Sequence, residues 1–420
     1  MQRPIARYGF LACSVVLVLV VLVCAPQPTA SAAEAVKIGA SLAVTGPFSA
    51  EAGPGMLKFM EAWGQVVNDE GGVFVQALGQ KVPLNLIVYD DESKPEKSVE
   101  LYEKLANVDR VHAFVGPFSS PITKAASTVA ERLNIPMVAC EANDTSLFTR
   151  GLQWFTSVLE LGRPWARTYF EMLADANKQG ATSYKTVAII SSDTPHTRDV
   201  GRGAADFAKQ AGVQVVFEQQ VPFRTTDFAG VLPRLRTATP DIVFLALWPP
   251  EMFAFLKQAE ELGLRPREIY ARFLGAAFVQ AVGERLAEGV VGASYSAQQW
   301  FTGTRVEKAL ARAGLKPYEL NWTAIKVTCL EALLQAIQDA GSLEKGKIMA
   351  TLRGYTLEKP IKALYGPLYF HSNVPVDGET ANGFGTQFPI VTQMQQGKQV
   401  VVWPKEIRDA PYRPVPWPTR

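Results

Sequence analysis

The stretch VHAFVGPFSSPITKAASTVAERLNIPMVA, residues 111–139, contains a strand, a helix and a second strand in direct succession. Residues 111–115 read as a buried strand, a Gly-Pro pair ends it, and an amphipathic helix begins after Ser119 and Ser120. One interpretation is that a serine hydroxyl caps the helix, whose first N–H groups have no partner. The other is that this helix N-terminus holds an anion. The residues of this stretch alone favour capping.

The same alternation of apolar strands and helical patterns runs through the chain in two successive blocks. Helices are expected over about residues 54–68 and 95–107 in the first block. The other strand patterns are AVKIGASL, VPLNLIVYDD and IPMVACE in the first block, and TVAIISSD, VQVVFEQQV, DIVFLALW and EIYARFLG in the second. Such alternation predicts right-handed βαβ crossovers and an α/β fold of two doubly wound parallel-sheet lobes.

Two such lobes bind ligands in the crevice at the carboxyl ends of their strands. Ser119 and Ser120 lie at one of these carboxyl ends. Their position in the predicted fold therefore favours the anion site over simple capping.

The N-terminus has the pattern of a secretory signal peptide, predicted over residues 1–33. Basic residues precede a short apolar run at residues 10–23, and small residues follow at 30–33. Lipid attachment at Cys24 is the less favoured alternative, because Val23 is a poor residue before a modified cysteine. Export to the periplasm as a soluble protein is expected.

Composition excludes several classes of protein. The net charge of +2, with both signs interspersed, gives no electrostatic footprint for nucleic acid. Outside the predicted signal peptide only Cys140 and Cys329 remain, and we interpret them as buried small apolar residues rather than as a bridge. The 34–420 region is too long for one core and predicts two lobes.

Motifs for catalysis, cofactors and metals are missing from the sequence. There is no phosphate loop, no G-x-G-x-x-G after a strand and no G-x-S-x-G elbow. His112, His196 and His371 are far apart, without metal-ligand spacing. The chain is therefore predicted to be no enzyme and to use no cofactor and no metal.

Several segments in order resemble the leucine/isoleucine/valine-binding family, the type I periplasmic binding proteins of ABC transporters. Residues 37–73 look like its opening strand, T-G-P turn and helix, and residues 84–105 like its second unit with the D-D-x-x-x-P signature. Residues 241–264 and 365–379 also match, as does a P-x-P-W ending. The resemblance covers nearly the whole chain after the predicted signal peptide.

The resemblance implies that the chain passes between the lobes three times and that the lobes close on a hinge around the solute. By comparison, lobe 1 comprises residues 35–157 and 297–365, and lobe 2 comprises residues 158–296 and 366–405. Residues 406–420 form a proline-rich tail, expected to lie extended on the surface.

The resemblance also implies a ligand site. Ser120 matches the family's carboxylate-binding serine, beside Ser119. Asn143 falls where threonine is usual, and an asparagine can donate to a carboxylate or accept from an amine. Trp248 ends a buried strand, so a core residue is the alternative, but the prolines that follow it favour the exposed rim of the crevice. The alternatives are a cap or a solvated residue for Glu141 and a solvated loop residue for His196. The implied ligand-binding set is Ser120, Phe118, Glu141, Asn143, His196, Trp248, Arg272 and Ser119.

Arg272 is the clearest departure from the family's amino-acid binders, which carry an acid near this place to pair with the ligand's ammonium. Binding a zwitterion here would need Glu141 or Glu51 to compensate. We therefore expect a carboxylate with a second acidic or polar end, or an aromatic acid stacked on Trp248. The alternative is that Arg272 points to solvent or pairs with a neighbouring acid.

The expected function is delivery of a small carboxylate-bearing solute to the membrane permease of an ABC importer, with the binding protein acting as a monomer. A ligand-sensing protein of the same fold, for amides or amino acids, is the alternative. The predicted signal peptide and the lack of a second membrane-length apolar run argue against a receptor or a cytosolic regulator.

Overall fold

The computed structural model describes residue 1 and residues 34–295, 297–320, 324–363 and 366–419. The chain divides into two units, Met1–Glu34 and Ala35–Arg420, and only the second is described below. The predicted signal peptide and Cys24 lie outside the described residues, apart from Met1. In the described part of the chain, no helix is long and apolar enough to cross a membrane.

The strand β5 (Ala113–Val115) shows why the first sheet is buried on both faces. Ala113 and Val115 join the apolar cluster that contains β1, whereas Phe114 points to the opposite face and joins residues of α3 and α4. Neighbouring strands in this sheet are parallel, in the order β17-β7-β6-β5-β1-β4. Its strands are β1 (Val36–Leu42), β4 (Leu84–Asp90), β5, β6 (Met137–Ala139), β7 (Phe155–Leu159) and β17 (Phe384–Gln387).

The second sheet has the order β19-β18-β12-β11-β10-β8-β9 and is parallel except at one edge. There β18 and β19 form an antiparallel hairpin that pairs with β12, a mixed edge that the sequence patterns did not predict. The strands are β8 (Thr186–Ser192), β9 (Gln214–Val221), β10 (Ile242–Ala246), β11 (Glu268–Phe273), β12 (Val291–Ser294), β18 (Ile390–Gln395) and β19 (Lys398–Trp403).

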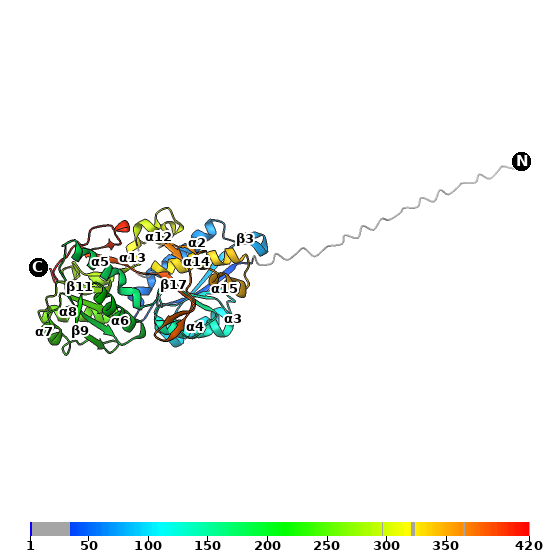
Figure 1. Cartoon of the computed structure of the whole chain (residues 1–420). Coiled ribbons are helices and arrows are strands. Elements are labelled where there is room, and N and C mark those ends of the chain that lie inside the picture. The colour runs from blue at the N-terminus through cyan, green and yellow to red at the C-terminus, as the bar shows by residue number, and fades with distance from the viewer. Residues whose placement is uncertain (2–33, 296, 321–323, 364–365, 420) are drawn as a thin grey trace. The chain divides into compact units, whose positions relative to one another are not determined.

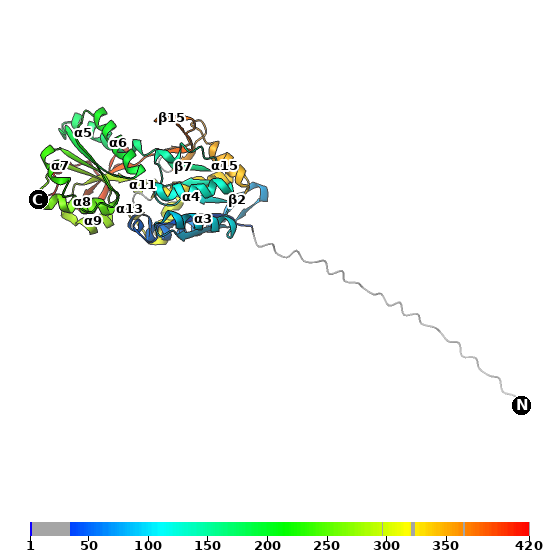
Figure 2. The same ribbon diagram turned by 90° about the horizontal axis from the view of Figure 1, so that it is seen from below.

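Helices cover both sheets, and the two expected from the sequence are present as α2 (Pro54–Asp69) and α3 (Pro95–Asn107). Figures 1 and 2 show the helices of the first sheet and those of the second gathered in separate parts of the unit. The first sheet carries α2, α3, α4 (Ser120–Leu133), α12 (Arg305–Ala313), α14 (Ile325–Ala340) and α15 (Lys345–Arg353). The second carries α5 (Arg167–Lys178), α6 (Pro195–Gln210), α7 (Leu232–Ala238), α8 (Pro249–Glu261) and α9 (Ala276–Val282).

We call each sheet with its helices a lobe. The chain passes between the lobes after β7, after β12 and after β17, which is the three-crossing arrangement of the predicted fold class. The third passage differs from the expected boundary at residue 365. Because β17 (Phe384–Gln387) pairs with β7, residues up to Gln387 remain with the first lobe, and only β18 begins the second.

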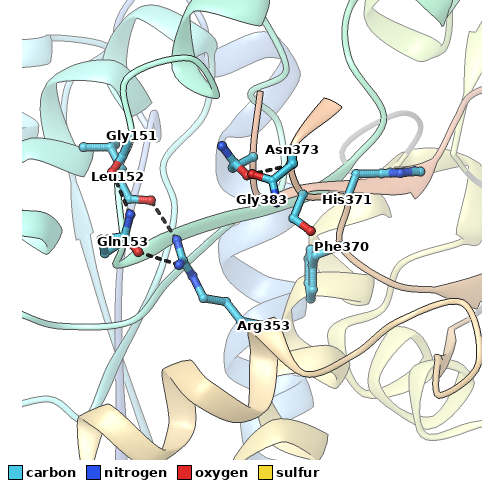
Figure 3. Close-up of a pocket in the computed structure, with 10 residues that line it drawn as sticks. Gly151, Leu152, Gln153, Arg353, Phe370, His371, Asn373 and Gly383 are labelled. Carbon is cyan, nitrogen blue, oxygen red and sulfur yellow. Dashed lines mark hydrogen bonds between the residues drawn. The ribbon is translucent and has the colours of Figure 1, made fainter. Parts of the chain in front are cut away.

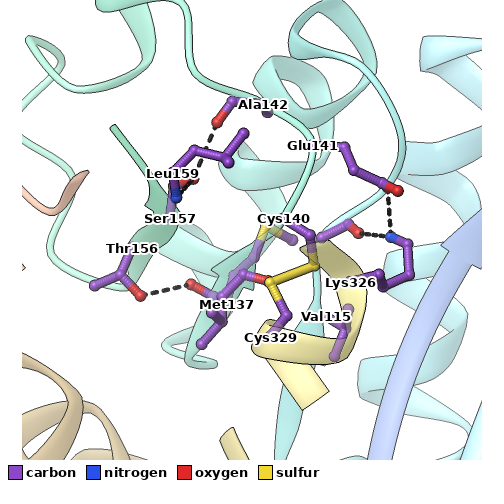
Figure 4. The surroundings of a disulfide bond; sticks show 12 residues. Val115, Met137, Cys140, Glu141, Ala142, Thr156, Ser157, Leu159, Lys326 and Cys329 are labelled. Carbon is purple, nitrogen blue, oxygen red and sulfur yellow. Dashed lines mark hydrogen bonds and ion pairs between the residues drawn. A yellow bond between two sulfur atoms is a disulfide. The ribbon is translucent and has the colours of Figure 1, made fainter. Parts of the chain in front are cut away.

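Cys140 and Cys329 form a disulfide, so their interpretation as separate buried residues was wrong. Cys140 follows β6 and Cys329 lies in α14, so the bond joins the first sheet to a helix that covers it (Figure 4). The two cysteines are 189 residues apart in sequence. The spacing of the two cysteines in the sequence did not indicate that they pair. They come together only because the chain returns to the first lobe at its second passage and forms α14 there.

The C-terminal segment after η5 (Lys405–Ile407) is extended, as expected, but its side chains also pack into the second lobe. Trp417 is buried, and its indole Nε1 donates to the carbonyl oxygen of Leu286 at 2.8 Å. The hydroxyl of Tyr412 donates to the carboxylate of Glu268 at the start of β11. The tail is therefore part of the second lobe's fold.

Candidate functional site

A cavity lies where strands of the two sheets end, and residues of both lobes line it. It encloses about 320 Å³ of empty space, but the centre of a water molecule fits in only about 10 Å³ of it. The side chains therefore nearly fill it in this conformation. The lining residues are Phe118, Ser120, Glu141, Asn143, Leu159, Trp165, His196, Trp248, Arg272, Tyr295 and Ile325. The structure thus brings together every residue of the predicted site except Ser119.

Ser119 and Ser120 have different roles at the start of α4. Ser119 is the residue before the helix, with φ of 72°, but its hydroxyl makes no capping bond and is buried without a hydrogen-bond partner among the described residues. The Oγ of Ser120 accepts from the backbone N–H groups of Asn143 at 3.2 Å and Asp144 at 3.3 Å. Since a hydroxyl can also donate, the proton of Ser120 remains for an acceptor in the cavity.

Glu141 forms a buried ion pair that the sequence did not reveal. Its Oε2 lies 2.7 Å from Nζ of Lys326, and both side chains are 0% exposed (Figure 4). The Lys326 ammonium also donates to the carbonyl oxygen of Gly116 at 3.1 Å. Burial raises the pKa of Glu141, and the Lys326 charge opposes that shift. The alternative that Glu141 faces solvent is excluded by its burial.

Asn143 links the first lobe to the chain's first passage. Its side-chain Nδ2 donates to the backbone carbonyl oxygen of Glu160 at 3.1 Å, and its backbone carbonyl oxygen accepts from the N–H of Gly162 at 2.6 Å. The amide group is therefore partly used in holding the passage against the cavity. Its predicted contact with a ligand stays a prediction.

Arg272 lies in the cavity wall and is 1% exposed, so it does not point to solvent. Its Nη2 lies 2.6 Å from Nε2 of His196. Its guanidinium lies over the rings of Phe273 at 4.3 Å and of Trp165 and Trp248 at 5.2 Å each. The second lobe therefore presents a buried cation surrounded by aromatic rings.

His196 is held in the neutral form. A guanidinium can only donate, so Nε2 of His196 accepts from Arg272 and the ring proton belongs on Nδ1. Burial and the Arg272 charge hold the pKa of His196 well below its usual range. The alternative of a solvated loop histidine is excluded, because the side chain is buried.

Trp248 was expected at an exposed rim, but it is only 3% exposed. Its ring centroid lies 5.3 Å from that of Phe48 and 6.4 Å from that of Phe118, both in the first lobe. It also stacks on Phe273 at 6.1 Å, and its Nε1 donates to Oγ1 of Thr194 at 3.2 Å. Contacts from both lobes therefore bury it.

Polar contacts also join the lobes beside the cavity. The Oδ2 of Asp199 in α6 accepts from the backbone N–H of Thr145 at 2.9 Å and from its hydroxyl at 2.8 Å. Thr145 follows β6 in the first lobe. Together with the Trp248 contacts, this places the two halves of the cavity in direct contact.

Sequence reasoning missed Trp165, Tyr295, Leu159, Ile325 and Lys326. The first three of these follow or end strands at the passages between lobes, where a connecting residue faces both halves. An aromatic directly after a passage was the available signal for Trp165. Lys326 lies in an apolar helix pattern, and an isolated lysine in such a pattern signals a buried partner.

A larger and more open hollow, with about 800 Å³ of empty space, lies on the first lobe alone, near residues 151–153 and 370–383 (Figure 3). The guanidinium of Arg353 holds its wall together by donating to Oε1 of Gln153 at 2.6 Å and to the carbonyl oxygen of Leu152 at 2.8 Å. Because these bonds tie protein groups to one another, the hollow offers less for a ligand than the cavity between the lobes.

Comparison with known proteins supports one family. Residues 35–384 match the family described as periplasmic binding protein. A curated relative, Leu/Ile/Val-binding protein homolog 7 of Brucella abortus, is 26% identical over 401 residues, which cover 91% of this chain and 95% of the relative.

Solved structures share the fold. The branched-chain amino acid transporter substrate-binding protein LivJ of Streptococcus pneumoniae, in complex with isoleucine, aligns with a TM-score of 0.68 at 18% identity, covering 87% of this chain and 98% of that one. An ABC transporter solute-binding protein of R. palustris, in complex with 4-hydroxybenzoate, aligns with a TM-score of 0.68 at 18% identity, covering 88% and 95%.

Proposed function

The chain belongs to the leucine/isoleucine/valine-binding family of periplasmic binding proteins, and from this membership we propose that it captures a small carboxylate-bearing solute between its lobes and delivers it to the permease of an ABC importer. The observation that carries the proposal is the shared cavity, to which each lobe contributes polar and aromatic side chains. In this proposal the protein acts as a monomer and as a binding protein, not as an enzyme.

The chemistry of the two walls supports a carboxylate as the recognised group. Ser120 has a hydroxyl proton to donate, and Arg272 supplies a permanent buried positive charge. Hydrogen bonds between charged groups in such a desolvated place are short and strong. A carboxylate between the two walls would be bound by both lobes at once.

The proposed delivery of the solute requires the two lobes to open and close about a hinge. The contacts of Trp248 with Phe48, and of Asp199 with Thr145, join the lobes and nearly fill the cavity. A solute must therefore enter when the lobes are apart, and closure then buries it. A permease can distinguish the closed form from the open one by the relative position of the lobes.

An extracytoplasmic location agrees with the family and with the disulfide. Bonds such as Cys140–Cys329 form and persist in oxidising compartments, including the bacterial periplasm. The predicted signal peptide would direct the chain there, with cleavage before about residue 34.

The fold itself leaves the solute open, because relatives with this fold hold isoleucine in one case and 4-hydroxybenzoate in another. The test is to purify the exported protein from its native cell and identify any small molecule that co-purifies, by mass spectrometry after denaturation. Uptake of that molecule, labelled, should then fall in cells lacking the protein and return with the wild-type gene. Undiminished uptake, or a purified protein that binds no small solute, contradicts the proposal.

A further inference from the structure

The D-D-x-x-x-P motif of residues 90–95 holds a neighbouring turn of the first lobe in place. The carboxylate of Asp90 accepts hydrogen bonds from the backbone N–H of Thr45 at 3.1 Å and from its hydroxyl at 2.7 Å. The buried carboxylate of Asp91 accepts from the N–H of Ser93 at 3.0 Å. The first acid of the motif therefore binds the turn, and the second fixes the loop that carries Ser93.

Ser93 joins this loop to the same turn by two further bonds. Its hydroxyl donates to the backbone carbonyl oxygen of Thr45 at 2.8 Å and accepts from the N–H of Phe48 at 3.1 Å. Gly46 lies so close to the loop that a Cβ atom there would be 2.3 Å from the carbonyl oxygen of Glu92. All of these contacts lie within the first lobe, so the turn keeps its place whether the lobes are open or closed.

The turn places the ring of Phe48 beside that of Phe118, which lines the cavity, and we call these two rings the socket. Their centroids are 5.3 Å apart, with an angle of 66° between the ring planes. Glu51 follows the turn in α1 (Ser49–Ala52) with its side chain outside the described residues, so the socket is defined without it. Trp248 of the second lobe lies against both rings, 5.3 Å from Phe48 and 6.4 Å from Phe118. Inclined ring pairs at such distances attract each other beyond their burial of apolar surface.

Trp248 is held in the second lobe by contacts that do not involve the socket. Its backbone N–H donates to Oε2 of Glu251 at 2.9 Å, and its indole Nε1 donates to Oγ1 of Thr194 at 3.2 Å. Its ring also stacks on that of Phe273, with the centroids 6.1 Å apart. Ring and socket can therefore each keep their shape when the lobes separate, and only the contact between them is lost.

The contact between Trp248 and the socket favours closure by itself. Phe48 is 8% exposed and Trp248 is 3% exposed in the closed conformation, and each loses the other ring on opening. Because both rings belong to the protein, their contact favours closure with or without a solute. The bonds between Asp199 and Thr145 act in the same direction through different residues.

We propose that Phe48 and Phe118 receive Trp248 on closure, and that this contact closes a fraction of the molecules without a solute. This rests on the proposed capture of a solute between the lobes and names how that site is closed. Phe48 is then a positioning residue, which acts on the solute through Trp248 and Phe118. Asp90 and Ser93 act one step further away, by holding the turn that carries Phe48.

The test follows closure in single molecules of the exported protein, freed of bound solute by denaturation and refolding with its disulfide intact. Fluorescent labels are attached at Glu100→Cys in the first lobe and at Lys257→Cys in the second, both exposed positions. The closed population is the one whose energy transfer matches the separation of these positions in the structure. We expect the labelled protein, otherwise unchanged, to show a closed and an open population.

Variants then test the socket. Phe48→Ala and Trp248→Ala should each lower the ratio of closed to open molecules about tenfold or more, because each removes the apolar surface that the contact buries. The double variant should show little further loss, because both changes remove the same contact. Ser93→Ala should lower the ratio less. Phe74→Ala is the control, since this ring of the first lobe is 45% exposed, and it should leave the ratio unchanged.

Three results overturn the proposal. One is a solute-free protein that shows only the open population. Another is a closed population that is unchanged in Phe48→Ala, or in Phe48→Leu if the alanine variant does not fold. The third is an equal loss in Phe74→Ala. Solute capture is judged separately, on the molecule that co-purifies, so it stands even if the socket does not close the lobes.

Discussion

The two halves of the cavity are built in different ways. In the first lobe, Ser120 and Glu141 are held by backbone N–H groups, by Lys326 and by the adjacent disulfide. In the second lobe, Arg272 and Trp248 rest on aromatic rings and on a neutral histidine. The first half is a polar surface locked by covalent and ionic bonds, and the second is a cationic aromatic surface. This difference suggests that the first lobe positions the carboxylate and that the second adds charge and shape on closure.

Removal of the disulfide should produce the largest effect and should act on the first half. In the chain-entropy description, a bond across 189 residues stabilises the fold by up to about 5 kcal/mol, and measured values are typically about 2–4 kcal/mol. We expect Cys140→Ala/Cys329→Ala to lower the free energy of unfolding by this amount and to weaken ligand binding. Urea denaturation and calorimetry measure the two effects.

The control for this pair of substitutions is the wild-type protein under reducing conditions, which should match the double variant. If the variant keeps full affinity for the ligand, ligand binding by the first half of the cavity does not depend on the disulfide. The contrast between the two lobes would then be wrong.

Substitution of Ser120 and, separately, of Ser119 should show which of the two neighbouring hydroxyls contributes to ligand binding. Ser120→Ala removes the acceptor of two backbone N–H groups and a donor to the ligand, and should weaken binding by about 1.5–3 kcal/mol. Ser119→Ala removes a buried hydroxyl without a partner among the described residues, and should leave affinity nearly unchanged. Calorimetry with the native ligand compares the two, and equal losses would contradict the assignment.

The strand patterns predicted the cavity well because parallel strands end at a common edge. Phe118, Glu141 and Trp248 each follow a strand, so their meeting follows from the fold alone. The sequence could not show which side chains pair there. The Glu141–Lys326 bond joins residues far apart in the chain, and the burial of Trp248 depends on Phe48 of the other lobe.

The third passage between the lobes was misplaced for a related reason. The short strand β17 (Phe384–Gln387) has little apolar pattern of its own and is fixed by pairing with β7. A boundary set by such pairing is not visible in local composition. The disulfide, likewise, depends on the return of α14 to the first lobe.

A contact between the lobes should have a smaller effect than a contact inside one half. Asp199→Ala removes two hydrogen bonds from Thr145 to a carboxylate across the interface, and should weaken binding by about 1–2 kcal/mol because closure becomes less favourable. Asp193→Ala is the matched control, since its exposed pair with Arg198 lies within the second lobe. Calorimetry measures both, and equal affinities for the two variants would show that the Thr145 bonds do not assist closure.

The smallest effect concerns protonation of His196 in the second half. Its pKa in the folded protein lies well below 6.5, so below about pH 6.5 the unfolded chain binds a proton that the folded protein refuses. The stability from neutral His196 is therefore complete above about pH 6.5 and is lost as the pH falls, by at most about 1.4 kcal/mol per pH unit. His196→Gln keeps an acceptor for Arg272 and does not titrate. Urea unfolding between about pH 7.5 and pH 5.5 should show a loss for the wild type that exceeds that of the variant by about 1 kcal/mol. Parallel losses would mean that His196 accepts a proton freely in the fold, and the second half would then not be held by the Arg272–His196 contact.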